Sequence, residues 1–219
     1  MTDLVPNVIA VLGAARSGSS CTAGILHTLG VSMGINMLPP NEMNPKGFFE
    51  AVGLRRMLAF TFRMVQDEGL KKLLSSDEII SNLKRHVNER MQRGSRSPLG
   101  VKHPWLCLLI PEMVEAWPGL KAVSINRDIN AVVASMEATG QFPGGKQNQR
   151  CNQVEKLIAK RDADLQQAGI PTLKLNYADV LKDSAKTVRD LVEFLGIMPT
   201  NEQIAEAVSF VDPTLCHNG

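Results

Sequence analysis

The chain has 219 residues, of which 44% are hydrophobic and 21% are charged, and this composition is typical of a soluble globular protein. The formal net charge of +2 and the lack of a long basic run argue against a nucleic-acid partner. No apolar stretch is long enough to span a bilayer, and the first residues do not resemble a secretion signal. We expect a soluble, cytoplasmic protein with a single domain over residues 1–219.

The first predicted strand, residues 8–12, runs directly into a glycine-bounded turn. The turn reads GAARSGSS over residues 13–20, and a helix that ends near Gly30 follows it. Free backbone N–H groups and the positive end of the helix dipole meet at such a turn, where they favour an anion. The segment therefore predicts a site for phosphate or sulfate.

The residues of this turn indicate which anion it suits. Gly13 and Gly18 have the spacing of the nucleoside triphosphate loop, but Ser19 stands where that loop carries its lysine. The basic residue is Arg16, inside the turn. Hydroxyl groups with one guanidinium suit a terminal phosphate with a group attached better than a magnesium triphosphate, which also needs a metal-binding acid.

The next part of the chain, residues 32–49, is rich in Gly, Pro, Asn and Met and is predicted to be a long ordered loop. Helices are expected over residues 50–68 and 76–92. The second of these has Ser75 and Glu78 at the spacing of a capping box.

Strands and helices then alternate to the end of the chain. Strands are expected over residues 99–102, 120–125 and 172–175. Helices are expected from Pro104, over 129–138 and 148–168, and around Val188 to Leu195, with a turn-rich loop over 140–145. This order predicts an α/β fold with a central parallel sheet between helical layers. Ligands bind at the carboxyl ends of the strands in such sheets, so the loops after residues 12, 101, 126 and 175 should lie together.

A second anion site is predicted at the end of the strand before Arg127. Ser135 lies on the following helix, and an arginine with a hydroxyl group suits a second phosphate. Two phosphate sites in one crevice fit a nucleotide with a 5′ group and a separate 3′-phosphate. A surface pair of Arg127 and Asp128 explains these residues equally well.

Three further residues are candidates for acid–base chemistry. Lys102 and His103 lie at the end of another strand, where the lysine could stabilise a leaving-group oxygen and the histidine could act as a general base. Glu50 ends the segment NPKGFFE and could place a carboxylate over the crevice. The alternative for Lys102 is simple exposure to solvent, for His103 a helix-capping or packing role, and for Glu50 a place in the first turn of a helix, where the dipole favours it.

The chain resembles the PAPS-dependent sulfotransferase family, and its bacterial-type members in particular. The matching segments occur in family order: GAARSGSS at 13–20, NPKGFFE at 44–50, VKHPWLCLL at 101–109, Arg127 with Ser135, YADVL at 177–181, FLG at 194–196 and FVDP at 210–213. Together they extend across nearly the whole chain.

The resemblance implies a P-loop fold that binds the donor 3′-phosphoadenosine 5′-phosphosulfate (PAPS) and releases 3′-phosphoadenosine 5′-phosphate (PAP), with no metal. The residues that would hold the 5′-phosphosulfate are Arg16, Ser17, Gly18, Ser19 and Ser20. The 3′-phosphate would be held by Arg127 and Ser135, with Tyr177 near the nucleotide. Arg16 and Lys102 would assist transfer, with Glu50 as base and His103 as its rival.

Several residues depart from the family pattern. The family often has Lys-Asp-Pro-Arg where this chain has Lys-His-Pro-Trp at 102–105, and Ile129 and Ala178 replace the usual proline and glutamate. The basic segment that helps many cytosolic members hold the 3′-phosphate is not visible. These departures affect the expected donor affinity and the choice of base.

The acceptor is expected to be a small molecule or glycan with a hydroxyl group or, as a second choice, an amine. Residues 32–95 should form an insertion that contributes to its site. An apolar lining is expected from Met33, Met37, Leu38, Met43, Phe48 and Phe142. A small P-loop nucleotide kinase and a non-catalytic nucleotide-binding module are the alternative functions, and the sequence does not indicate an oligomeric state.

Overall fold

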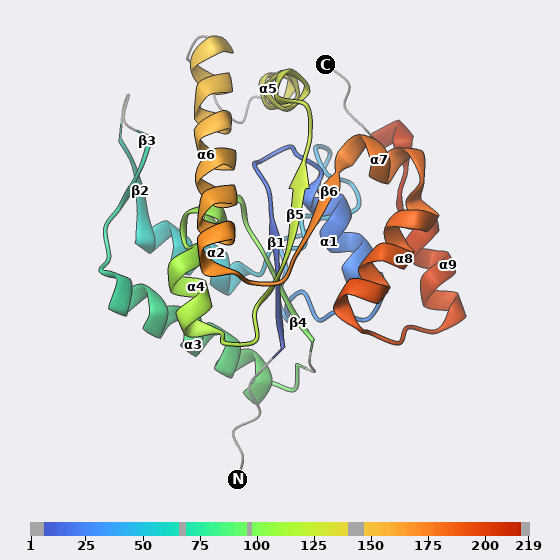
Figure 1. Cartoon of the computed structure of the whole chain (residues 1–219), viewed down its shortest axis with the longest axis horizontal. Coiled ribbons are helices and arrows are strands. Elements are labelled where there is room, and N and C mark those ends of the chain that lie inside the picture. Colours follow the sequence, from blue (N-terminus) through green and yellow to red (C-terminus); the bar gives the residue numbers. More distant parts are fainter. Residues whose placement is uncertain (1–6, 66–68, 96–97, 140–146, 216–219) are drawn as a thin grey trace.

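The computed structural model describes residues 7–65, 69–95, 98–139 and 147–215. At its centre lies a parallel sheet with the strand order β4, β1, β5, β6, which Figure 1 shows between two helical layers. The strands are β1 (Val8–Leu12), β4 (Leu99–Lys102), β5 (Lys121–Asn126) and β6 (Thr172–Asn176). The α/β fold with a central parallel sheet that the sequence predicts is therefore confirmed.

The sheet is covered by helices on both faces, which explains the continuous apolar run of β1. Ile9 and Val11 pack into one core cluster and Val8, Ala10 and Leu12 into the other. The helices on one side are α1 (Ser19–Thr28), α7 (Tyr177–Lys182), α8 (Ser184–Leu195) and α9 (Asn201–Phe210). Those on the other include α3 (Ser76–Gln92), α4 (Ile110–Ala116) and α6 (Gln147–Ala168). Helix α5 (Ile129–Ala138) follows β5, and 3₁₀ turns lie at Pro104–Leu108 and Pro213–Leu215.

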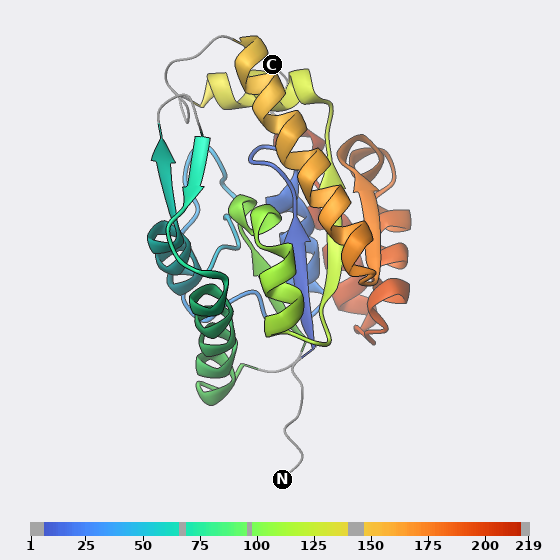
Figure 2. The ribbon, with the colours of Figure 1, turned by 60° about the vertical axis from the view of Figure 1, so that its left-hand side comes forward.

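The helix predicted over residues 50–68 is wrong in its second half. Helix α2 (Val52–Thr61) ends early, and strand β2 (Phe62–Val65) pairs antiparallel with β3 (Gly69–Lys72). Figure 2 shows this hairpin standing apart from the main sheet. Phe62 is buried and packs edge-on against Trp105, with ring centres 5.8 Å apart. That contact is tertiary, so the local spacing of apolar residues did not reveal it.

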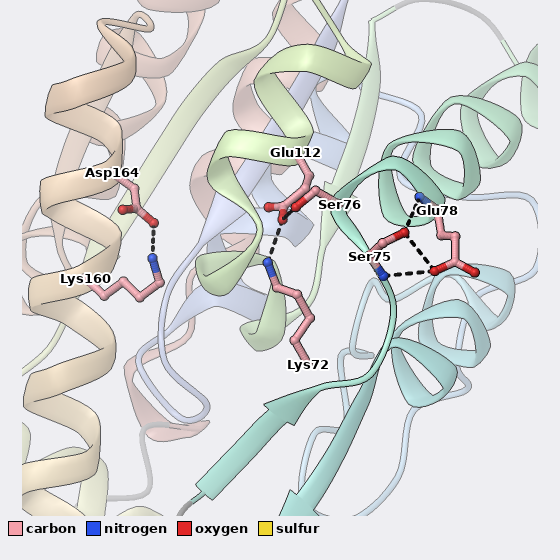
Figure 3. Close-up of polar contacts among 7 residues, drawn as sticks. All are labelled: Lys72, Ser75, Ser76, Glu78, Glu112, Lys160 and Asp164. Carbon is pink, nitrogen blue, oxygen red and sulfur yellow. Dashed lines mark hydrogen bonds and ion pairs between the residues drawn. The ribbon is translucent and has the colours of Figure 1, made fainter.

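Polar contacts attach the hairpin to the helices beside it. Nζ of Lys72 donates to Oε1 of Glu112 on α4, and the hydroxyl of Ser76 donates to the same oxygen, as Figure 3 shows. In the same view, Ser75 and Glu78 form the reciprocal capping box at the start of α3. The predicted beginning of that helix is confirmed.

Two helices at the end of the chain were not predicted. Helix α7 begins at Tyr177, directly after β6, and α9 begins after Thr200, whose hydroxyl accepts from the N–H of Gln203. The spacing of Thr200 and Gln203 is a capping-box signal that the sequence analysis did not use. The loop predicted over residues 140–145 lies outside the described residues.

Candidate active site

A cavity of about 750 Å³ lies at the carboxyl end of the sheet. Each of the four strand ends contributes to its lining, through residues that include Arg16, Lys102, Arg127 and Tyr177. The loops after residues 12, 101, 126 and 175 therefore lie together, as the strand order predicts. Lining residues also come from residues 38–48, helix α2 and the segment 210–215.

Helix α1 begins beside this cavity, and no side chain caps its first turn. Gly18 lies at the N-cap position with a φ of 91°, and Ser19 and Ser20 line the cavity. First-turn N–H groups without partners in the helix, next to the positive end of its dipole, suit a bound anion. A methyl group on Gly18 would lie 2.2 Å from the ring of Tyr177, so glycine is required for this ring to pack on the turn.

The two arginines of the predicted anion sites are neighbours. Nη1 of Arg127 donates to the backbone oxygen of Arg16 at 3.2 Å, and the guanidinium of Arg127 lies 5.4 Å from the ring centre of Tyr177. Burial, followed by the positive charge of Arg127, lowers the pKa of Arg16. An anionic ligand would compensate this concentration of positive charge. The arginines of the two predicted anion sites thus line one cavity.

Arg16 is held in an uncommon backbone conformation by its surroundings. Its φ is 65°, a region that residues other than glycine rarely occupy. Its Nε donates to the hydroxyl of Ser135 at 3.0 Å, and Ser135 is fully buried. Uncommon backbone conformations of this kind often occur at functional sites, and Arg16 lines the cavity.

Two of the predicted donor-binding residues lie behind the cavity surface. Ser17 is 2% exposed, and its hydroxyl donates to the backbone oxygen of Ala14 at 2.7 Å. Ser135 supports Arg16, as described above. Neither belongs to the cavity lining, so in this structure both stabilise the arrangement of the loop and its arginine. Direct contact of Ser17 and Ser135 with a donor stays a prediction.

The acid–base candidates form a buried polar group in the cavity wall. Nζ of Lys102 lies 2.7 Å from Oε1 of Glu50 and donates to the hydroxyl of Ser20 at 3.0 Å. Lys102 is 4% exposed and Glu50 is 8% exposed. Burial lowers the pKa of Lys102 below its ordinary value, against the opposing charge of Glu50, and nearby Arg16 lowers it further. Three segments that are separate in the sequence therefore supply Ser20, Glu50 and Lys102, which form one hydrogen-bonded group.

His103 adjoins the same carboxylate, with Nε2 3.9 Å from Oε2 of Glu50. Its Nδ1 accepts the backbone N–H of Trp105 at 3.2 Å. Burial lowers the pKa of His103 to about 4, so the ring is neutral at pH 7 and its proton resides on Nε2. A ring nitrogen that carries a proton donates rather than accepts. This geometry favours Glu50 over His103 as the group that accepts a proton.

The predicted apolar residues divide between the cavity and the core. Leu38, Met43 and Phe48 line the cavity. Met33 and Met37 pack in the core cluster around α1, and Phe142 lies outside the described residues. Several lining residues were not predicted: Arg55, Ala59, Trp105, Phe210, Asp212 and Leu215.

Arg161 is a further residue of the site that the sequence analysis missed. It is fully buried on α6, and its guanidinium donates to the backbone oxygens of Leu12 and Ile125 and to the side-chain oxygen of Asn126. Those residues end β1 and β5, directly before the glycine turn and Arg127. Arg161 therefore fixes the two strand ends relative to each other.

Replacing Arg161 with methionine should lower the free energy of unfolding by about 2 kcal/mol, because buried oxygens lose their donors. We also expect weaker PAP binding, since the turn and Arg127 are no longer held in register. Urea denaturation and PAP titration measure the two effects. Lys160→Ala is the matched control, because its ion pair with Asp164 (Figure 3) is exposed and contributes little. Unchanged PAP affinity in folded Arg161→Met would contradict this role.

The described residues contain no helix with the length and apolarity needed to cross a membrane. Across the same residues, no group of three or more His, Cys, Asp or Glu side chains is placed to hold a metal ion.

Comparisons with known proteins agree with the geometry. A family model described as "Sulfotransferase family" matches residues 6–201. A search of curated proteins finds no match.

Solved structures with a similar fold include two sulfotransferases and a retinol dehydratase. Sulfotransferase STF9 from Mycobacterium avium is 12% identical, with a TM-score of 0.62 over 94% of this chain and 68% of that protein. A sulfotransferase from Alicyclobacillus acidocaldarius is 17% identical, with a TM-score of 0.53 over 98% of this chain and 96% of that protein. Retinol dehydratase in complex with androsterone and inactive cofactor PAP is 15% identical, with a TM-score of 0.50 over 95% of this chain and 65% of that protein. At these identities the likeness concerns the fold alone.

Proposed function

The chain belongs to the sulfotransferase family, and on that basis we propose that it transfers a sulfuryl group from PAPS to a hydroxyl group of a small-molecule or glycan acceptor. The observation that carries this proposal is the shared cavity. Arg16 and Arg127 border it together with the buried pair of Glu50 and Lys102. The complex of retinol dehydratase with PAP supports the same choice of donor.

The donor would lie across the two arginines. The first turn of α1, with Gly18, Ser19 and Ser20, would bind the 5′-phosphosulfate through N–H and hydroxyl groups, beside Arg16. Arg127 would bind the 3′-phosphate, and Tyr177 would pack near the nucleotide. In this arrangement Ser17 and Ser135 act mainly by holding the turn and Arg16 in place.

Transfer would follow from groups that already lie in position. The acceptor oxygen attacks sulfur while the bond between sulfur and the 5′-phosphate oxygen of the donor breaks, which leaves PAP. Glu50 accepts the acceptor's proton, and the cationic Lys102 and Arg16 stabilise the negative charge on the departing oxygen. Positioning and fixed charges would supply most of the acceleration, as in phosphoryl transfer.

The acceptor would enter over the insertion expected in residues 32–95. Residues 38–48 and the face of α2 that carries Arg55 and Ala59 line the cavity on that side. Trp105 lies beside His103, with ring centres 5.1 Å apart, and gives this end an aromatic wall. The cytoplasmic location expected from the sequence stays a prediction.

The experiment that tests the proposal compares donors and then acceptors. Isothermal titration with PAP and with ATP plus magnesium should show a preference for PAP of at least about tenfold, since the turn carries no lysine after Gly18. A preference for magnesium ATP would favour the kinase alternative. Sulfur-labelled PAPS is then supplied with a panel of hydroxyl and amine acceptors. PAP binding without any transfer would favour the non-catalytic module.

Arg127→Ala should weaken PAP binding about tenfold to 100-fold, the loss expected for a charged hydrogen bond to phosphate. The loss should be specific to the 3′-phosphate, so affinity for 5′-AMP should change little. Titration of both nucleotides measures the ratio. Arg189→Ala, on the exposed face of α8, is the control. An equal loss for PAP and 5′-AMP would remove Arg127 from the 3′-phosphate.

A further inference from the structure

The cations that line the cavity differ in how they are paired. Arg127 contacts Arg16 and the ring of Tyr177, and Arg16 also donates to Ser135. Lys102 forms an ion pair with Glu50. Lys46 donates to the backbone oxygen of Phe210 at 2.6 Å and lies 3.8 Å from Asp212. Among the described residues, Arg55 has no hydrogen-bond or ion-pair partner for its guanidinium.

The placement of Arg55 on α2 aims it at the cavity. Arg55 and Ala59 lie one helical turn apart and both line the cavity, while Leu54 and Leu58 form the buried face of the helix. Arg55 and the next residue, Arg56, are both exposed, but Arg56 does not line the cavity. Two adjacent arginines on one helix therefore have different surroundings, and only the first borders the site.

Arg55 acts electrostatically on a different group of the cavity wall from Arg16 and Arg127. The positive charge of Arg127 acts on Arg16, and that of Arg16 acts on Lys102. His103 lies on the other side of Glu50, and its pKa is lowered first by burial and then, among other charges, by Lys102 and Arg55. The charge of Arg55 thus acts on His103, whereas Arg16 lies in the glycine turn and Arg127 donates to its backbone.

The cavity that Arg55 lines has both polar and apolar side chains. The apolar residues that line it include Leu38, Pro39, Met43, Phe48, Ala59 and Trp105. The ring of Trp105 is fixed edge-on between His103 and Phe62. An uncompensated guanidinium beside an apolar and aromatic wall matches a ligand with an apolar body and one anionic group.

We infer that the acceptor carries a carboxylate in addition to its hydroxyl group, and that Arg55 binds this carboxylate while the hydroxyl faces Glu50. The inference rests on the proposed function, because it assumes that the donor occupies the end of the cavity around Arg16. Arg55 then determines specificity for acidic acceptors and takes no part in the transfer itself.

Hydroxyphenyl-alkanoic acids of increasing chain length, each paired with its neutral methyl ester, test this inference. Binding to the protein saturated with PAP is measured by calorimetry, and transfer from labelled PAPS is measured as kcat/KM. The best acid should bind at least about tenfold tighter than its ester, as expected for one charge-assisted hydrogen-bonded pair. Arg55→Ala should reduce this ratio to near one, and Arg55→Lys should retain part of it.

Arg56→Ala is the matched control and should leave the ratio of acid to ester unchanged. PAP affinity should be the same in all these variants, because the inference assigns Arg55 to the acceptor and not to the donor. Loss of PAP affinity in Arg55→Ala would overturn the inference, and so would equal binding of acid and ester or failure of every acid to bind. Failure of the wild-type protein to bind PAP would instead contradict the proposed function.

Discussion

Glu50→Gln is expected to lower kcat by about 100-fold to 10,000-fold, the range by which a positioned general base accelerates proton transfer. Glutamine has the same shape and keeps an oxygen that can accept from Lys102, so the buried contact between the two segments survives. It cannot accept the acceptor's proton. PAP affinity should therefore remain within about twofold of the wild-type value, because the change affects a proton-transfer step and no donor contact.

The measurement is transfer from labelled PAPS at saturating donor, with PAP titration alongside. His103→Ala is the informative comparison, since Nδ1 of His103 accepts from Trp105 and its Nε2 carries the proton. We expect a smaller fall in turnover for His103→Ala than for Glu50→Gln. The reverse result would make His103 the base and show that the assignment to Glu50 is wrong.

Arg16→Ala is expected to reduce kcat by about 100-fold to 1,000-fold, the cost of removing one donor that stabilises developing charge. The guanidinium of Arg16 lies on the cavity wall and is fixed by Ser135, so it is in position before the sulfuryl group moves. The fall in kcat should exceed the loss of PAP affinity, because PAP lacks the transferred group.

Ser135→Ala provides a graded comparison for Arg16. It keeps the guanidinium but removes the oxygen that accepts from Nε, and it should lower kcat about tenfold, in line with one misplaced catalytic contact. Single-turnover kinetics separate this effect on the chemical step from donor binding. If Arg16→Ala loses PAP affinity and kcat to the same extent, Arg16 is a binding residue without a separate part in transfer.

The sheet could be predicted from the sequence because its signals are local. The apolar run of residues 8–12 and the strand over 121–126 are buried on both faces, and glycine or proline marks many of the boundaries. The hairpin at residues 62–72 was missed because tertiary contacts stabilise it. Phe62 packs on Trp105 and Lys72 pairs with Glu112, and both partners lie far away in the sequence.

The site shows the same division between local and distant information. Arg16, Lys102 and Arg127 lie at or shortly after strand ends, and the carboxyl ends of parallel strands lie together at one edge of the sheet. Arg55 and Arg161 lie on helices, and helical spacing alone does not show which helix crosses behind β1 and β5 or which face borders the cavity. The burial of Ser17 and Ser135 likewise depends on packing.

The central claim is that one cavity binds two separated phosphate groups of an adenosine nucleotide. A comparison of PAP with ADP by isothermal titration tests this claim most directly. Both ligands carry two phosphate groups, at the 3′ and 5′ positions in PAP and only at the 5′ position in ADP. The account predicts that PAP binds at least about tenfold tighter, since only PAP reaches both Arg16 and Arg127. Equal or tighter binding of ADP would contradict it.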